Sequence, residues 1–328
     1  MQWVDRVGRR LKLRDLHILL MVVERGSMAK AAADLAISQP AVSKAIADLE
    51  HTFGLRLLDR SRGGVEPTVY GNALAARGRV IFDELKHGVD ELAFLADPSE
   101  GSLRIGITES VAAGLLPAVV ERFSREHPRI RLDVAQTVIS KLHYGELRDR
   151  SIDLMLSRIP SPFNEADLEA EVVYDDPVVV VAGGRSKWAR MRRLTLADLA
   201  GERWILPPSD TMPGSLTAEL FRASGVEPPR APVTTLSIHL WRRLAAEAQF
   251  VTMIPMSVLR FGNRDRSLKV LPIKLPVQQR PVGVITLKNR ALGSVAKLFI
   301  DCVRRTVKRE LDKGRLLSRN GSSRTAGS

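Results

Sequence analysis

The sequence predicts a mixed α/β fold in three parts: a small N-terminal domain made mostly of helices, one long helix, and a larger domain of alternating strands and helices. Three observations predict it. Apolar residues recur at helical spacing in the first 53 residues, residues 68–97 contain no proline, and short β-rich segments alternate with amphipathic ones from residue 103 onward. The length of 328 residues suits two or three domains.

Composition narrows the class of protein. Hydrophobic residues make up 45% and charged residues 27%, as in ordinary soluble globular proteins. The formal net charge of +13 favours a polyanionic partner or an anionic membrane surface. A single cysteine, Cys302, excludes an internal disulfide and a cysteine-rich zinc site and fits a reducing compartment. Because no segment approaches about 18 consecutive apolar residues and the N-terminal segment is too charged for a secretion signal, we expect a cytoplasmic protein that does not enter a membrane.

Two short helices are predicted before residue 36. The first has apolar residues at helical spacing, and Gly26 and Ser27 then break the pattern before "MAKAAADLA" resumes it. The apolar residues of the first helix are Leu16, Leu19, Leu20 and Val23. Ser27 can cap the second helix, and the small side chains of residues 31–33 allow a third helix to cross it closely.

The stretch "AISQPAVSKAIADLE" at residues 36–50 predicts the third helix. Ser38 suits the N-cap, and Gln39 and Pro40 suit the first turn, where proline costs no helical hydrogen bond. One face is apolar and consists of Val42, Ile46, Leu49 and Phe53. The opposite face consists of Pro40, Ser43, Lys44 and Ala47, with Gln39 at its exposed tip.

The polar face of this third helix suits the major groove of DNA. Glutamine can pair with adenine, lysine can donate to guanine and serine is adaptable, while nothing bulky stops the helix from approaching base edges. An isolated helix of this kind would more simply be ordinary surface. Three helices of these lengths in this order, however, are typical of a helix-turn-helix, so DNA recognition is the favoured interpretation.

A short two-stranded wing is predicted after the third helix. In "GLRLLDRSRGGVEPT", hydrophobic residues surround a Gly63-Gly64 turn. The interleaved arginines, Arg56, Arg60 and Arg62, could reach DNA phosphates or the adjoining minor groove and add affinity with little sequence information. A solvated, charged hairpin without a role is the alternative.

One long helix is predicted from a cap at Thr68 to Asp97, and Pro98 then ends it. Steps of four and three residues, the spacing of a coiled-coil seam, connect Leu74, Gly78, Ile81, Leu85, Gly88, Leu92 and Leu95. Such a seam favours pairing with a second chain. Packing of this helix against its own domain is the alternative.

From residue 103 onward the pattern predicts α/β lobes. "LRIGIT", "IRLDVAQT" and "DLMLS" indicate strands, with an amphipathic helix between the first two, and "VVVVA", "FVTMIP" and "PVGVITLK" continue the alternation. We expect parallel strands flanked by helices, in two lobes rather than in one sheet. Such sheets bind small molecules at the carboxyl ends of their strands, where helix N-termini offer free N–H groups that suit an anionic ligand.

Polar residues follow several of these strands and could converge on one cleft. They are Thr108, Glu109, Ser110, Thr137, Ser140, Arg158, Ser209, Asp210, Thr211 and Ser237. Because serine and threonine cap helices in all kinds of proteins, each residue taken alone could be a cap without a ligand.

Residues 13–72 resemble the winged helix-turn-helix of the LysR-type transcriptional regulators. The resemblance rests on the run A-A-x-x-L-x-x-S-Q-P-A-V-S, which extends from Ala31 to Ser43, and on the L-L-x-R of the wing. The DNA-binding residues that it implies are Ser27, Ser38, Gln39, Pro40, Ser43, Lys44, Arg60 and Arg62. Contacts to bases and grooves are implied for Gln39, Pro40, Ser43 and Lys44, and contacts to the DNA backbone for Ser27, Arg60 and Arg62.

The rest of the chain is similar to the same family. "GITESVAAGLLP" at residues 106–117 matches the opening of its two-lobed effector domain, which resembles periplasmic binding proteins and holds a co-inducer between the lobes. The resemblance implies that the long helix pairs two chains antiparallel. It also implies a homotetramer, a dimer of dimers, that binds double-stranded DNA at dyad-like sites, bends it, and changes contact with RNA polymerase.

These observations divide the chain into segments. We predict a winged helix-turn-helix domain at 11–69, a dimerisation helix at 70–97, a two-lobed effector domain at 98–310 with its second lobe at about 177–285, and a disordered basic tail at 311–328. The chain should cross between the lobes near residues 175–177 and 281–290, and a final helix from Ser294 should return to the first lobe.

Catalysis has no candidate in the sequence. The six histidines show no metal-ligand spacing, and no G-x-S-x-G, P-loop or paired-cysteine motif occurs. Asp175 and Asp176 are adjacent carboxylates, but neighbours in an extended segment face opposite sides, so a shared acid–base site is not expected. Cys302 lies on a predicted helix and is expected to pack in the core. We therefore expect no enzyme, no metal site and no cofactor.

Two other classes of protein are alternatives. One is an enzyme or metabolite-binding domain fused to a DNA-binding head, which turnover of a bound metabolite would reveal. The other is an architectural protein, which would show no preferred site in competition with random DNA.

Overall fold

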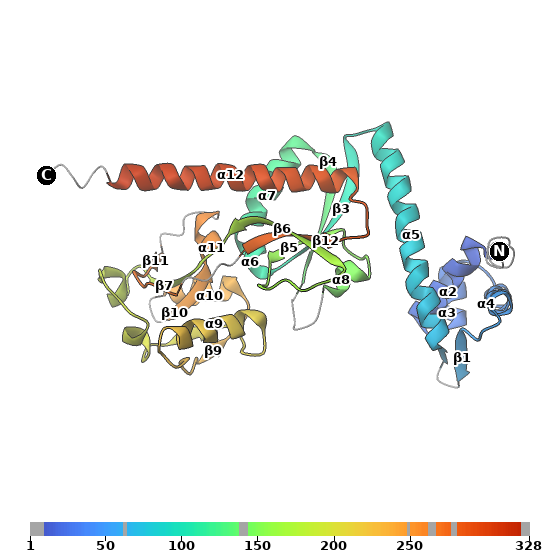
Figure 1. Cartoon of the computed structure of the whole chain (residues 1–328), viewed down its shortest axis with the longest axis horizontal. Coiled ribbons are helices and arrows are strands. Elements are labelled where there is room, and N and C mark those ends of the chain that lie inside the picture. Colours follow the sequence, from blue (N-terminus) through green and yellow to red (C-terminus); the bar gives the residue numbers. More distant parts are fainter. Residues whose placement is uncertain are drawn as a thin grey trace. The chain divides into compact units, whose positions relative to one another are not determined.

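The computed structural model describes residues 10–61, 64–137, 144–247, 250–261, 267–276 and 281–322, without the side chains of 60–61 and 313–322. The chain divides into two units, residues 1–90 and 91–328, and each is described by itself (Figure 1). The described part of the first unit contains short helices, a wing and most of a long helix, and that of the second contains two β-sheets with their helices.

Three helices of the first unit begin and end where local signals predict. They are α2 (Leu13–Arg25), α3 (Met28–Asp34) and α4 (Gln39–Phe53). Gly26 follows α2 with a left-handed φ of 61°, which glycine adopts without a Cβ clash. The side chains of Ser27 and Ser38 accept hydrogen bonds from backbone N–H groups in the first turns of α3 and α4, and so cap both helices.

One apolar cluster holds these helices together. Leu16, Leu19, Ala31, Val42 and Ile46 are each fully buried in it. Complete burial of an aliphatic side chain of this size stabilises a fold by about 1.5–3 kcal/mol. The apolar face predicted for α4 therefore lies in the core of its own domain, and the third helix is anchored without using its polar face.

The predicted wing is a two-stranded antiparallel hairpin. β1 (Leu58–Ser61) pairs with β2 (Gly64–Pro67). The Glu50 carboxylate on α4 accepts hydrogen bonds from the backbone N–H groups of Leu57 and Leu58, at 2.7 and 3.2 Å. These bonds fix the start of the wing to the third helix.

The long helix α5 (Val69–Ala96) has two stretches with different surroundings. A Cβ atom at Gly78 would meet Leu16 and Leu20 at 3.1–3.3 Å, so this part of the predicted seam packs against the domain's own helices. Farther along, Phe82 and Phe94 are half-buried, whereas the other large apolar side chains are exposed, and they are Ile81, Leu85, Val89, Leu92 and Leu95. Packing against its own domain, one of the two alternatives, therefore holds for the side of the helix that carries Leu74, Gly78 and Phe82.

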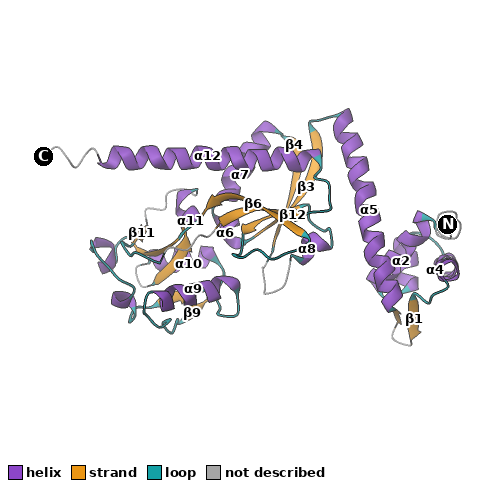
Figure 2. Ribbon diagram, in the orientation of Figure 1, coloured by secondary structure: helices purple, strands orange, loops and turns teal. Residues whose placement is uncertain are grey.

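The first lobe of the second unit is built on a five-stranded mixed sheet (Figure 2). Its order is β4 (Arg129–Gln136), β3 (Glu100–Ile107), β5 (Leu154–Arg158), β12 (Pro281–Leu287) and β6 (Leu168–Asp175). β3 runs parallel to β4 and β5, whereas β12 is antiparallel to β5 and β6. The expectation of parallel strands is wrong for β12, because the chain reaches it from the other lobe and not through a helix on the same sheet.

The second lobe also has five strands. Their order is β11 (Leu268–Val270), β7 (Val178–Gly183), β10 (Val251–Pro255), β8 (Trp204–Leu206) and β9 (Val233–Thr234). β8 is parallel to β9 and β10, whereas β7 is antiparallel to β10 and β11. The expectation of parallel strands is therefore wrong for β7 as well, because the chain enters β7 directly from the first lobe. The helical segments of this lobe are Lys187–Arg190, Ala197–Leu199, α9 (Met212–Ala223), α10 (Ile238–Ala246) and α11 (Met256–Arg260).

The crossovers between the lobes agree with the prediction at one place and differ at the other. The first lies between β6 and β7, at residues 176–177, as predicted. The second lies before Pro281 and not at residues 281–290, because β12 is a strand of the first lobe. The second lobe therefore ends before residue 281 rather than at about 285. The hydrogen-bond partners of β12 lie in β5 and β6, and such distant pairing leaves no local trace in the sequence.

Helices pack against the first sheet. They are α6 (Glu109–Ala113), α7 (Leu115–Glu126), α8 (Gly145–Arg148) and α12 (Ser294–Ser322). Phe299 on α12 packs edge-on against Phe123 on α7, with the ring centroids 5.4 Å apart, so the last helix returns to the first lobe as predicted. Cys302 is fully buried in the same cluster, and burial raises the pKa of its thiol.

The end of the chain differs from the prediction. The final helix continues through Ser322, so residues 311–322 are helical where a disordered tail was expected. Leucine, lysine and arginine in this stretch favour continuing a helix that has already begun. Residues 323–328 lie outside the described residues. None of the helices in the described ranges is both long enough and apolar enough to cross a membrane.

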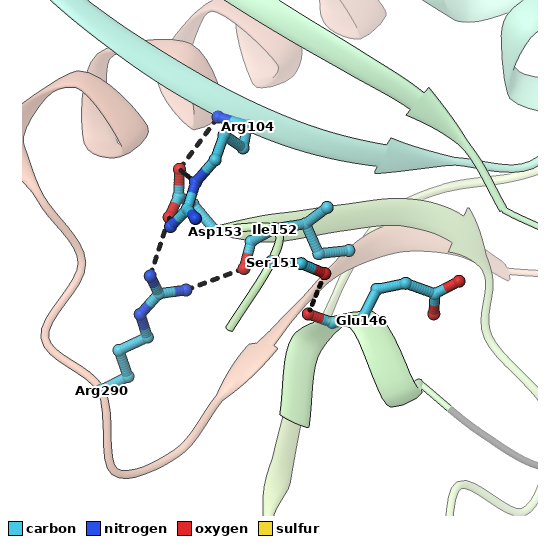
Figure 3. A network of polar contacts seen from close by, with 6 residues as sticks. All are labelled: Arg104, Glu146, Ser151, Ile152, Asp153 and Arg290. Carbon is cyan, nitrogen blue, oxygen red and sulfur yellow. Dashed lines mark hydrogen bonds and ion pairs between the residues drawn. The ribbon is translucent and has the colours of Figure 1, made fainter. Parts of the chain in front are cut away.

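A buried ionic cluster fastens the start of β5 to β3 and to the segment after β12 (Figure 3). Asp153 Oδ1 accepts from Arg104 Nη2 at 2.6 Å and from Arg290 Nη2 at 2.8 Å. Arg290 is 6% exposed and also donates to the Ile152 carbonyl oxygen at 2.8 Å. Burial raises the pKa of Asp153, but the hydrogen bonds and charge of Arg104 outweigh burial, so this pKa lies below its usual value.

Candidate functional site

The two faces of α4 have opposite surroundings. Val42 and Ile46 are fully buried in the domain core, whereas Gln39 and Lys44 are exposed. Of the other predicted contact residues on this helix, Ser38 and Pro40 are exposed and Ser43 is half-buried. The helix thus presents short polar side chains on a surface narrow enough to enter the major groove of DNA.

The other predicted DNA-contacting residues lie around this helix. Ser27 is half-buried at the N-cap of α3. Arg56 is exposed at the base of the wing, 3.8 Å from Asp59, and an exposed pair at this distance adds little stability. The side chain of Arg60, and Arg62 altogether, lie outside the described residues. Lys30, an exposed basic residue in the first turn of α3, was not singled out from the sequence, although its place beside a capping serine was a usable signal.

A second candidate site is a cavity of about 150 Å³ in the second unit, lined by residues of both lobes. The predicted ligand-binding residues that line it are Thr108, Glu109, Ser110, Thr137, Arg158 and Thr211. The expectation that loops after different strands converge therefore agrees with the geometry for these six residues. Thr108 precedes α6 and Thr211 caps α9, so helix N-termini from both lobes reach the cavity.

The remaining predicted residues are placed differently. Ser237 does not line the cavity, and its side chain accepts from the Leu240 N–H at 3.3 Å as the cap of α10. Ser209 and Asp210 are exposed and also lie outside the lining. For these three residues the local turn and helix ends determine the position. Ser140 lies outside the described residues.

The apolar wall of the cavity and one polar residue in it were not predicted from the sequence. Gln136, at the end of β4, lines the cavity, and so do Leu216, Leu236, Trp241 and Met253. In the sequence these apolar residues look like the core-facing positions of ordinary helices and strands. The position of Gln136 directly before Thr137, at the end of a predicted strand, was a signal that could have been used.

A buried carboxylate connects the cavity with the first crossover between the lobes. Asp176 Oδ2 accepts from Arg158 Nη2 at 3.1 Å and from Ser257 Oγ at 2.7 Å, and Oδ1 accepts from the Ser257 N–H at 2.8 Å. Burial raises the pKa of Asp176, and the neighbouring Arg158 and Ser257 offset part of this. Asp175 is exposed while Asp176 is buried, so the two adjacent carboxylates do not share a site.

Two buried donors at the cavity have no hydrogen-bond partner within the part of the chain that the structure describes. They are Nη1 of Arg158 and Nε1 of Trp241. A buried donor without an acceptor costs about 1–3 kcal/mol. A ligand with an acceptor oxygen could remove this cost.

Glu109 connects the lobes at the same cavity. Its Oε1 accepts from the backbone N–H of Ile238, the first residue of α10, at 3.1 Å, and its Oε2 accepts from Gln136 Nε2 at 2.6 Å. Glu109 belongs to the first lobe and Ile238 to the second, so this carboxylate spans the opening between them.

Two protein-family models match this chain, one for each unit. The model described as "LysR substrate binding domain" matches residues 96–308. The model described as "Bacterial regulatory helix-turn-helix protein, lysR family" matches residues 13–72. The first match includes the cavity and the second includes α4 and the wing.

Known proteins resemble the chain over most of its length. The HTH-type transcriptional regulator GbpR of Azospirillum brasilense is 30% identical over 296 residues, which cover 90% of this chain and 86% of GbpR. The structure of a full-length OxyR variant from Pseudomonas aeruginosa has a TM-score of 0.65 at 19% identity, covering 90% of this chain and 95% of that one. Full-length CbnR complexed with its target DNA has a TM-score of 0.51 at 23% identity, covering 90% and 100%. These structures share the fold.

Proposed function

The chain belongs to the LysR family of DNA-binding transcriptional regulators, and from this membership we propose that it binds dyad-like promoter sites as a homo-oligomer and responds to a small-molecule co-inducer. Its relatives are regulators and not enzymes. We place its action in the cytoplasm, where bacterial DNA is accessible.

The polar face of α4 is the single observation that carries the proposal. We assign base and groove contacts to Gln39, Pro40, Ser43 and Lys44, and supporting contacts to Ser27, Ser38, Arg60 and Arg62. This assignment is supported by the burial of the opposite face of α4, which leaves the polar face exposed for a duplex. The solved complex of CbnR with its target DNA shows that a chain of this fold binds DNA, which is further support.

Pairing of two chains would use the exposed part of α5. An apolar stripe from Ile81 to Leu95 on one helix is unusual for a surface that meets only water, and its spacing suits a helical partner. A second copy of the chain provides the same stripe, and a symmetric pair places two recognition helices on one duplex. A dimer of such dimers would bend promoter DNA and change its contact with RNA polymerase.

The co-inducer would occupy the cavity between the lobes. A ligand can shift the protein between two arrangements only if it binds them with different affinities. The cavity meets this requirement because residues of both lobes line it, so its shape depends on how the lobes close. Arg158 connects the cavity with the first crossover, and Glu109 connects the first lobe with α10 of the second lobe.

Selection of binding sites from a pool of random duplexes, at physiological salt, tests the proposed function. The expected result is enrichment of one dyad-like motif, bound by an even number of chains. Binding to the pool without enrichment would support the architectural alternative and contradict the proposal. Sedimentation of the protein with a selected duplex gives the number of chains.

A further inference from the structure

Glu109 occupies a place where an anionic ligand would otherwise bind. The first N–H groups of a helix and its dipole form an anion site. At the start of α10, the Ile238 N–H donates to Glu109 at 3.1 Å, and the Leu240 N–H donates to Ser237 Oγ at 3.3 Å. The chain therefore supplies its own carboxylate to this helix end.

The charges at the cavity leave no positive charge for a second carboxylate. Among the lining residues that the structure describes, Arg158 is the basic one and Glu109 the acidic one. Arg158 is already paired with the buried Asp176. With both carboxylates ionised the group carries one net negative charge, and with Asp176 protonated it is neutral. While Asp176 is ionised, a bound anion gains no counter-charge, because Arg158 is already paired, and an uncompensated buried charge is costly.

The N-terminus of α9 also reaches the cavity but offers few donors. Pro213 has no N–H, and the Gly214 N–H donates to Thr211 Oγ1 at 3.2 Å. The hydroxyls of Thr211 and Thr217 donate to backbone carbonyl oxygens, at 2.6 and 2.8 Å. This side of the cavity therefore does not replace the anion site that Glu109 fills.

The cavity also offers an apolar wall and two buried side-chain donors that have no acceptor among the described residues. Trp241 is 5% exposed, and its Nε1, like Nη1 of Arg158, has no acceptor among the residues described. Leu216, Leu236 and Met253 form part of the apolar wall. The volume of about 150 Å³ is comparable to that of a cavity that holds one benzene molecule.

We propose that Glu109 makes this cavity selective for an uncharged ligand, a small and mostly apolar molecule of about one six-membered ring that carries a hydrogen-bond acceptor such as a carbonyl oxygen. The acceptor satisfies Trp241 and Arg158, and the ring fills the apolar wall. This inference rests on the proposed function, in which the cavity receives the co-inducer. It replaces the anionic ligand that helix N-termini suggested from the sequence.

Benzamide and benzoate test the proposal, because they have the same shape and differ by one charge. Isothermal titration calorimetry with the full chain at neutral pH should show benzamide binding about tenfold more tightly than benzoate. Glu109→Gln keeps an oxygen for the Ile238 N–H. In this variant the affinity for benzoate should rise about tenfold relative to the affinity for benzamide. Glu121→Gln removes the same charge from an exposed position on α7 and should leave the ratio unchanged.

Several results would overturn the proposal. Wild-type protein that binds benzoate as tightly as benzamide, or that binds neither up to their solubility limits, contradicts the selectivity directly and needs no variant. If the ratio of benzamide affinity to benzoate affinity is the same in Glu109→Gln as in Glu121→Gln, Glu109 does not determine the selectivity. Leu216→Trp, which fills the cavity, should abolish benzamide binding, and unchanged binding would place benzamide elsewhere and overturn the proposal.

The proposed function fails by a different measurement. Selection of a DNA motif requires no ligand. If the protein selects a motif but prefers benzoate, the proposed function stands and this inference is wrong. If the protein prefers benzamide but selects no motif, the inferred ligand preference of the cavity stands and the proposed function is wrong.

Discussion

Arg158 Nη2 donates to Asp176 Oδ2 at 3.1 Å, so a residue that lines the ligand cavity is bonded to a residue of the crossover between the lobes. Ser257, at the start of α11 in the second lobe, donates two further hydrogen bonds to the same carboxylate. A ligand that contacts Arg158 therefore contacts a hydrogen-bond partner of the Asp176 carboxylate, and this carboxylate is bonded to residues of both lobes. This is the physical route by which binding can bias lobe closure.

Loss of this carboxylate should destabilise the second lobe. We expect Asp176→Asn to lower the free energy of unfolding by about 2 kcal/mol, because the amide keeps only one of the two oxygens that accept from Arg158 and Ser257 and places an N–H group against these donors. Asp175→Asn changes the exposed neighbour and should stay within about 0.5 kcal/mol of wild type. Urea denaturation followed by tryptophan fluorescence measures this, since Trp188, Trp204 and Trp241 all lie in the second lobe. Equal losses in the two variants would contradict a buried ion pair.

The buried Asp176 and the half-buried Asp153 should respond oppositely to pH. Burial raises the pKa of Asp176, so the stability it contributes is greatest at low pH and falls as the pH rises from about 3.9 through its folded pKa. For Asp153, burial is outweighed by Arg104 and the pKa is lowered, so its contribution is present above about 3.9 and is lost as the pH falls through its folded pKa. Denaturation between about pH 3 and pH 6 measures the free energy of unfolding that each variant loses relative to wild type. This loss should grow with pH for Asp153→Asn and shrink with pH for Asp176→Asn. Two deficits that change in the same direction would refute the assignment.

Two glycines of α5 should respond differently to alanine. A Cβ at Gly88 meets nothing within 4 Å, so Gly88→Ala should stabilise the helix by about 0.5–1 kcal/mol. A Cβ at Gly78 would meet Leu16 and Leu20 at 3.1–3.3 Å, and crowding there should cancel or reverse this gain. Thermal unfolding followed by circular dichroism compares the two. Equal stabilisation would mean that Gly78 is not packed against α2.

The exposed stripe on α5 should control the oligomeric state. Leu92 is 69% exposed, and Leu92→Asp should weaken self-association by at least about 2 kcal/mol, because it puts a charge into an apolar interface. Val69 on the same helix is 81% exposed but lies off the seam, and Val69→Asp is the matched control. Analytical ultracentrifugation over a range of concentrations reports the change. Unaltered association of Leu92→Asp would place the interface elsewhere.

Local signals made the DNA-binding domain predictable. The caps at Ser27 and Ser38, the break between helices at Gly26 and the apolar spacing of α4 each involve residues a few positions apart, and the structure has them as expected. The end of α12 was less predictable, because composition favoured disorder while the individual residues favoured continuing a helix.

Features that depend on residues far apart in the chain could not be predicted from the sequence. The Glu109 carboxylate meets a backbone group 129 positions away, and no spacing rule indicates such a contact. The place of β12 in the first sheet depends on pairing with β5 and β6, which its own alternating pattern does not select. Trp241 and Met253 line the cavity, but in the sequence they are indistinguishable from core residues, because burial against protein and burial against a ligand favour the same side chains.

Base recognition by α4 is the central claim, and the affinity of Gln39→Ala for two kinds of DNA tests it most directly. On a duplex selected by the wild-type protein, this variant should lose about 1–3 kcal/mol of binding free energy, and on random duplexes it should lose little. Arg62→Ala is the comparison, because loss of a phosphate contact should weaken binding to both duplexes alike. Fluorescence anisotropy at physiological salt gives all six constants, for the wild-type protein and the two variants on both kinds of duplex. Equal losses for Gln39→Ala on selected and random DNA would show that this face of α4 does not read the sequence.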